Sequence, residues 1–198
     1  MFPRWLASSS AAPTPCARGR CARSLKRDPL GRWRLTSMPL ITRFFSFDDV
    51  TPAQGWDLLA WCRSRGASEF TLAALVAPRQ SQRMKDFFAV LDPYERPRAS
   101  RRLLSAPVGG SFTRDVPLWQ LTPQTQELLR AGWSTGFASR QYDEDLWLED
   151  LTVYRDGEFM MGVLSHENGG VLRVTELELA DLRRTGFPDR DSVPWLGF

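Results

Sequence analysis

Apolar residues recur at helical spacing in four parts of the chain. The clearest part begins with Thr51-Pro52, has Gln54 three residues after the threonine, and stops at Gly66, which predicts a helix with a capping box. Similar start, stop and spacing signals predict three further helices, in residues 84–91, 122–132 and 175–186. Residues 85–91 would also fit a strand, so for this segment the alternative stays open.

Alternation of apolar and polar residues with a period of two is clearest in residues 147–174. Asp156-Gly157 and Asn168-Gly169 each lie between apolar-rich runs and are typical of two-residue hairpin turns. The turns predict the following pairs: Arg155 with Glu158 as a cross-strand ion pair, Tyr154 with Phe159, Val153 with Met160, Thr152 with Met161, Ser165 with Leu172, and His166 with Val171. The face predicted to meet the core contains Thr152, Tyr154, Phe159, Met161, Val163, Ser165, Leu172 and Val174.

These elements predict an α+β fold. We expect residues 38–198 to form a single domain, in which three to four helices pack on a C-terminal antiparallel β-meander at about residues 147–174. Residues 69–77 are apolar and short enough for a buried strand. Residues 92–116 contain three prolines and Gly109-Gly110, which predicts a long loop. This loop carries an arginine cluster, Arg96, Arg98, Arg101 and Arg102.

Composition places the chain among soluble globular proteins. Of its 198 residues, 42% are hydrophobic and 25% are charged, and no window approaches the roughly 18 apolar residues of a membrane-spanning helix. The three cysteines, Cys16, Cys21 and Cys62, are an odd and sparse set, which indicates a reducing compartment and a cytoplasmic protein. Cys16 and Cys21 have no second Cys or His pair nearby, so the sequence predicts no metal site, and it predicts no cofactor.

The net charge of +3 averages two unlike segments. Eight basic residues and one acidic residue give residues 1–37 a charge of +7, which leaves −4 for residues 38–198. The first segment lacks apolar periodicity, so we expect it to be disordered. It has three alternative explanations: a start assigned upstream of the true one at Met38, a targeting peptide, or a functional basic arm. The acidic body favours a protein partner over nucleic acid.

One motif suggests catalysis. Gly132-Trp133-Ser134-Thr135-Gly136 matches G-x-S-x-G, and acidic residues and then His166 follow in the order of the hydrolase triad. Ser134 and His166 are therefore the catalytic candidates of an alternative hypothesis, a small serine- or histidine-dependent hydrolase. The motif requires a strand before the serine, whereas residues 122–132 predict a helix. A thiol pair of Cys62 with His166 is disfavoured, because Cys62 lies on the apolar face of its helix.

His166 and Arg173 form a candidate anion-binding site. In the predicted register Arg173 lies opposite Leu164 and diagonal to His166, so the two side chains could bind a phosphate or a carboxylate. The competing interpretation is that His166 is an exposed turn residue.

Catalytic residue types are scarce, whereas acidic and aromatic surface residues are abundant. The leading hypothesis is therefore a non-enzymatic binding or regulatory protein of the immunity or adaptor kind, which binds another protein through its acidic run and its tryptophan-containing loops. Arginine supplies 24 of the 26 basic residues, which suits a GC-rich bacterial genome. A second alternative is nucleic-acid binding through the basic N-terminal arm and the segment Arg96–Arg102. The candidates for the partner-binding surface are Asp143, Glu144, Asp145, Trp147, Trp133, Arg96, Arg98, Arg101 and Arg102.

Overall fold

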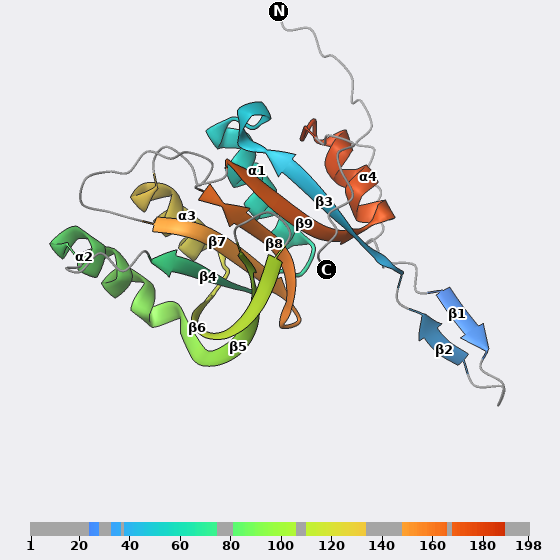
Figure 1. Ribbon diagram of the computed structural model, residues 1–198, viewed down its shortest axis with the longest axis horizontal. Helices are drawn as coiled ribbons and strands as arrows, with labels where there is room; N and C mark the ends of the chain where they lie inside the picture. The colour runs from blue at the N-terminus through green and yellow to red at the C-terminus, as the bar shows by residue number, and fades with distance from the viewer. Residues whose placement is uncertain are drawn as a thin grey trace, which may run out of the picture. The chain divides into compact units, whose positions relative to one another are not determined.

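The structure is a computed structural model that describes residues 24–27, 33–36, 38–74, 81–105, 110–133, 148–165 and 168–188 (Figure 1). The chain divides into two units, Met1–Met38 and Pro39–Phe198. In the first unit, β1 (Ser24–Arg27) pairs antiparallel with β2 (Trp33–Thr36), a hairpin that the sequence pattern did not predict. The rest of the segment predicted to be disordered lies outside the described residues.

The second unit contains an antiparallel sheet of seven strands in the order β3-β9-β8-β7-β4-β6-β5 (Figure 1). The strands are β3 (Leu40–Ser46), β4 (Glu69–Ala74), β5 (Glu95–Ser105), β6 (Gly110–Gln120), β7 (Leu148–Arg155), β8 (Glu158–Leu164) and β9 (Gly169–Thr175). The described helices are α1 (Pro52–Ser64), α2 (Gln82–Leu91), α3 (Pro123–Gly132) and α4 (Glu176–Arg184), with short 3-10 turns η1 (Phe47–Asp49) and η2 (Asp92–Tyr94). The predicted α+β class is confirmed, but the sheet is larger than the predicted meander.

The helix predictions are confirmed, and local side-chain caps explain why. Thr51, Thr122 and Thr175 cap α1, α3 and α4, and each takes part in a capping box with the residue three positions later. Ser81 caps α2 by accepting a backbone N–H hydrogen bond. Gly66 follows α1 with φ of 93°, a left-handed conformation that glycine adopts without strain. Segment 85–91 is thus helical and not a strand.

Residues 92–116 do not form the predicted long loop. After η2 they form β5 and part of β6, which pair in an antiparallel hairpin with a register shift between Arg96 and Ala99. Pro97 lies within this irregularity, on a strand at the edge of the sheet. Proline is tolerated at such positions because no ladder hydrogen bond is lost there. The prolines therefore mark an irregular edge strand and not a loop.

The meander is confirmed as β7, β8 and β9, but only part of its register is. Arg155 pairs with Glu158 and Tyr154 with Phe159, as predicted, on either side of the turn at Asp156-Gly157. Met160 is then an extra residue on β8, because Val153 pairs with Met161. The other predicted pairs are wrong, since the observed ones are Thr152 with Gly162, Met161 with Leu172, Gly162 with Val171, and Leu164 with Gly169.

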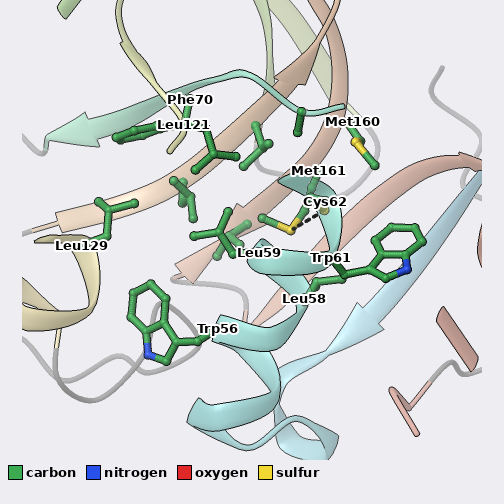
Figure 2. Close-up of a cluster of buried hydrophobic side chains, with 14 of the residues drawn as sticks. Trp56, Leu58, Leu59, Trp61, Cys62, Phe70, Leu121, Leu129, Met160 and Met161 are labelled. Atoms are coloured by element: carbon green, nitrogen blue, oxygen red, sulfur yellow. Dashed lines mark hydrogen bonds between the residues drawn. The ribbon is translucent and has the colours of Figure 1, made fainter. Parts of the chain in front are cut away.

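The register errors come from the extra residue Met160 and from Gly169, which pairs with Leu164 as the first residue of β9 and so does not lie in a two-residue turn. The sheet is also buried on both faces. The larger core lies between the sheet and the helices and includes Trp56, Leu59 and Cys62 of α1 (Figure 2). Two smaller clusters lie on the other face: one has Leu104, Phe159, Leu164 and Val171, and the other has Val116, Leu118 and Tyr154. Because both faces are apolar, alternation alone does not identify the face that meets the helices. The residues of the predicted core face are therefore divided between the two faces of the sheet. Tyr154 and Phe159 lie on the face away from the helices, whereas the face that meets the helices has Met161, Val163, Leu172 and Val174.

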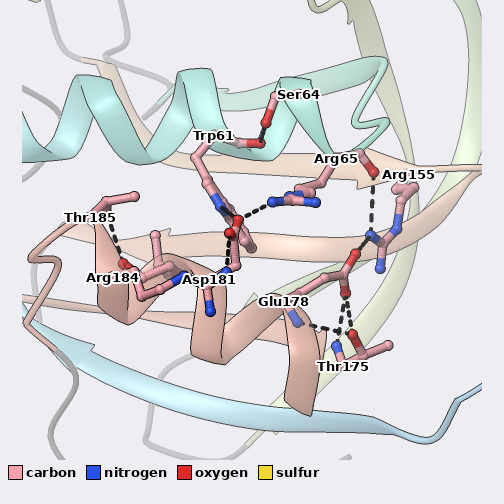
Figure 3. A network of polar contacts seen from close by, with 10 residues as sticks. Trp61, Ser64, Arg65, Arg155, Thr175, Glu178, Asp181, Arg184 and Thr185 are labelled. Carbon is pink, nitrogen blue, oxygen red and sulfur yellow. Dashed lines mark hydrogen bonds and ion pairs between the residues drawn. The ribbon is translucent and has the colours of Figure 1, made fainter. Parts of the chain in front are cut away.

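Two carboxylates attach α4 to the rest of the unit (Figure 3). Glu178 accepts a hydrogen bond of 2.5 Å from Arg155 of β7, and it also completes the capping box of α4. Asp181 accepts hydrogen bonds from the Trp61 indole and the Arg65 guanidinium of the α1 region. The predicted ion pair of Arg155 with Glu158 is therefore wrong, because Arg155 reaches α4 instead.

Candidate partner-binding surface

The arginine cluster lies on the hairpin of β5 and β6. Residues 95–120 contain five arginines and two acidic residues, a formal charge of +3, whereas residues 38–198 together carry −4. The rest of the folded unit thus carries −7, so the hairpin is a basic element on an acidic unit. Such a local charge orients and accelerates the approach of an oppositely charged partner.

Arg96 and Arg98 lie on the exposed first half of β5, on either side of Pro97. Arg98 Nη2 donates a hydrogen bond of 3.2 Å to the carbonyl oxygen of Asp115 on β6. This contact holds the Arg98 side chain across the hairpin, with its charge still in solvent.

Arg114 and Phe112 are exposed residues on β6, further along the same hairpin, opposite Arg101 and Leu103 of β5. They are two residues apart on one strand, so their side chains point to the same side. Arg114 is exposed, and Phe112 is 44% exposed, which is unusual for a large aromatic side chain. We refer to Arg96, Arg98, Phe112 and Arg114 as the basic surface. The sequence pattern did not indicate Phe112 and Arg114, because residues 111–115 contain one apolar side chain and no alternation that would predict a strand.

Arg101 has a different role from the other arginines. Its Nη2 donates a 2.9 Å hydrogen bond to Glu69 of β4, and its guanidinium lies 5.8 Å from the ring centroid of Tyr154 on β7. The Tyr154 hydroxyl in turn donates to the carbonyl oxygen of Arg102, at 3.1 Å. Arg101 and half-buried Arg102 thus anchor the hairpin over β7. Burial is the main cause that raises the pKa of Tyr154, so its hydroxyl stays a hydrogen-bond donor at neutral pH.

The Tyr154→Phe substitution tests this anchor. We expect it to lower the free energy of unfolding by about 1 kcal/mol, because one buried hydrogen bond is lost while the ring keeps its packing. Urea unfolding measures the change, with Tyr94→Phe at half-buried η2 as the control, which should change little. Equal stabilities of the Tyr154→Phe variant and the parent protein would show that the contact does not hold the hairpin.

The other partner-surface candidates have different outcomes. Trp133 packs in the core and is 5% exposed, which leaves its ring little surface for a partner. The acidic candidates and one tryptophan lie outside the described residues: Asp143, Glu144, Asp145 and Trp147.

The catalytic candidates Ser134 and His166 also lie outside the described residues. The residues before Ser134 form α3, which ends at Gly132, so the strand that a nucleophile elbow requires is not there. Cys62 is fully buried against Met161, with Sγ and Sδ 3.9 Å apart. Desolvation by burial raises the pKa of Cys62 to about 12, which keeps the thiol protonated and unreactive.

Arg173 does not occupy the position predicted for the anion site. Its register partner on β3 is Thr42, and on the β8 side Leu164 pairs with Gly169, so the predicted pairing of Arg173 with Leu164 is wrong. Its Nη1 lies 3.4 Å from Glu158, an exposed carboxylate. The charge of Arg173 is therefore already paired.

Fold and surface together define an α+β domain with a large antiparallel sheet and a basic hairpin at one edge of it. Comparison with protein-family models, curated proteins and solved structures finds no match for the chain. Within the described part of the chain, no group of three or more His, Cys, Asp or Glu residues is placed to hold a metal ion. None of the described helices is long and apolar enough to cross a membrane.

Proposed function

We propose that this chain is a non-enzymatic binding or regulatory protein that recognises another protein through the basic surface. The observation that supports this proposal is the exposure of three arginines and a phenylalanine on a hairpin that Arg101 and Tyr154 anchor. Arginine side chains form strong, often bidentate hydrogen bonds with carboxylates, and an exposed aromatic ring supplies an apolar contact. The partner chemistry that fits is an acidic segment with an adjacent apolar residue.

The charge distribution favours such a segment over nucleic acid. A long polyanion would approach the acidic remainder of the unit, with its charge of −7, as well as the hairpin. A short acidic segment of a protein contacts the hairpin alone. Arg101, which nucleic-acid binding would also use, is already paired with Glu69.

Charge reversal on the basic surface tests the proposed function. The full-length chain is immobilised, proteins retained from an extract of its own cells are identified by mass spectrometry, and the purified partner is titrated by calorimetry. We expect the double variant Arg96→Glu with Arg98→Glu to weaken binding at least about tenfold, because attraction becomes repulsion at two positions. Arg130→Glu, at an exposed position on α3, is the matched control and should bind like the parent protein.

Two results would overturn the proposal. One is that no protein is retained specifically. The other is that the double variant and Arg130→Glu bind the partner equally well. Titration with a 20-base-pair DNA duplex tests the alternative of nucleic-acid binding. Binding of the duplex that is tighter than binding of the protein partner, and that weakens steeply with salt, would indicate a nucleic-acid-binding protein.

A further inference from the structure

β3 forms the edge of the sheet opposite to β5. All seven of its residues pair with β9 in continuous register, from Leu40 with Thr175 to Ser46 with Gly169. On its other side, β3 has no strand partner among the described residues. An edge strand of this length presents a row of backbone donors and acceptors to another strand.

The register identifies the backbone groups that point away from the sheet. Phe47 N–H donates to the carbonyl oxygen of Asn168, at 3.0 Å, which continues the ladder by one pair. Hydrogen-bonded pairs alternate along antiparallel strands, so the odd-numbered residues of β3 bond to β9. The N–H and C=O groups of Leu40, Thr42 and Phe44 therefore point outward.

The same three residues share one side-chain face of β3. Phe44 packs with the smaller cluster around Leu104 and Phe159, whereas Phe45 and Ile41 pack on the helix side. Leu40 is 41% exposed, so an apolar side chain remains at one end of this face. Along this face the residues are Leu40, Thr42 and Phe44, so the pattern is apolar, polar, apolar. When a second β3 strand runs antiparallel beside it, each apolar residue of one strand meets an apolar residue of the other.

Charge disfavours one of the symmetric arrangements, and the pattern Leu40, Thr42, Phe44 favours an axis at Thr42. Arg43 is the charged residue of β3, and it lies on the helix side, 3.8 Å from Glu176 of α4. A two-fold axis at Arg43 would place two arginines opposite each other, which is unfavourable. An axis at Thr42 instead places Arg43 opposite Ile41 of the other copy. β3 contains no proline, bulge or lysine of the kind that natural edge strands use against association, and the charge of Arg43 on its helix side is paired with Glu176.

We propose that β3 pairs antiparallel with β3 of a second copy of this chain, about a two-fold axis at Thr42. Leu40 then lies opposite Phe44 of the second copy, in both directions, and Thr42 lies opposite Thr42. The outward backbone groups of these residues are hydrogen-bonded, and the exposed Leu40 side chain is covered by the phenylalanine ring. The two sheets become one continuous sheet. Because the hairpin with the basic surface is at the opposite edge of each sheet, the dimer has two such surfaces.

Disulfide trapping tests the pairing and its register. Thr42→Cys is introduced into the full-length chain with Cys16→Ser and Cys21→Ser, while buried Cys62 is retained. In a hydrogen-bonded pair the Cα atoms are about 5.5 Å apart, within the range of roughly 4.4–6.8 Å that a disulfide spans. We expect mild oxidation to give a covalent dimer for Thr42→Cys. Leu40→Cys is the matched control and should not cross-link, since its neighbour is Phe44 of the second copy. Cross-linking of Arg43→Cys without Thr42→Cys would overturn the register.

Sedimentation equilibrium tests the association itself. We expect the full-length chain to be dimeric at about 100 µM and the Thr42→Pro variant to be monomeric and still cooperatively folded. Proline removes an N–H that points outward and leaves the ladder with β9 intact. If Thr42→Pro fails to fold, Leu40→Lys replaces it, with Leu177→Lys on exposed α4 as its control. A monomeric parent chain at this concentration, or a dimer that persists in the folded variant, would overturn the proposal.

Discussion

Replacing Glu178 by glutamine is expected to lower the free energy of unfolding by about 3 kcal/mol. The side chain of Glu178 is 7% exposed and that of Arg155 is 20% exposed, so the substitution leaves a mostly buried guanidinium without a charged partner. Removing one member of a buried ion pair typically costs about 3–5 kcal/mol, because the remaining charge stays desolvated. Urea unfolding followed by circular dichroism measures this loss.

Comparing glutamine with alanine at position 178 separates the contribution of the ion pair to stability from that of the helix cap. Glutamine can still complete the capping box of α4, as Gln54 does in α1, whereas alanine cannot. We therefore expect Glu178→Ala to cost about 1 kcal/mol more than Glu178→Gln. Glu176→Gln, at the exposed first residue of α4, is the control and should change the free energy of unfolding by less than about 0.5 kcal/mol. A Glu178→Gln variant as stable as this control would show that the ion pair contributes nothing.

The pH dependence of the same variant has a definite sign. Burial raises the pKa of Glu178, but hydrogen bonds from Arg155 and Thr175 and the charge of Arg155 outweigh it, so the pKa lies below its ordinary value of 4.5. A carboxylate with a lowered pKa in the folded state stabilises the protein above the unfolded pKa, and that stability is lost as the pH falls through the folded value. The difference in stability between the parent protein and Glu178→Gln should therefore be largest at neutral pH. It should shrink on acidification below pH 4.5.

Substitution of Gly170 is expected to have the second largest effect. A Cβ atom at Gly170 would overlap the ring of Phe45 and lie 2.9 Å from the backbone oxygen of Gly162. Overpacking of this kind costs about 1–3 kcal/mol, and here one of the two neighbours is backbone, which does not rotate away. We expect Gly170→Ala to lose about 2 kcal/mol and Gly170→Val up to about 3 kcal/mol, as measured by thermal and urea unfolding.

A double-mutant cycle identifies the steric cause. Phe45→Leu shortens the side chain that a Cβ at Gly170 would meet, so Gly170→Ala should cost less in the Phe45→Leu background. The expected coupling is at least about 0.5 kcal/mol. Additive effects would mean that contact with the Phe45 ring is not the cause of the loss.

The helices were predictable because their signals are local. Thr51 with Gln54, and Thr175 with Glu178, lie three residues apart, so both partners of each capping box are visible in a short stretch of sequence. The turn at Asp156-Gly157 is equally local, and both of its residues adopt positive φ in the structure. The α+β class followed from these elements.

The basic hairpin was not predictable from the same kind of signal. Arg96, Arg98 and Arg101 were recognised as a cluster, but the prolines around them are typical of both loops and irregular edge strands. The pairing of β5 with β6 distinguishes the two, and the hairpin is also contacted by Tyr154 of β7, which is distant in the chain. The roles of the arginines differ for the same reason, because Glu69, which binds Arg101, lies 32 residues away in the chain.

By itself, the sequence determined where α1, α3 and α4 begin and end, the first hairpin turn of the meander, and the separation of a basic segment from an acidic body, since neighbouring residues decide each of these. Tertiary structure alone decided the strand order, the extra residue Met160, the pairing of Arg155 with Glu178, and which arginines are exposed. These features depend on contacts between residues distant in the chain, and on a sheet buried on both faces, where alternation of apolar residues does not choose one register over another.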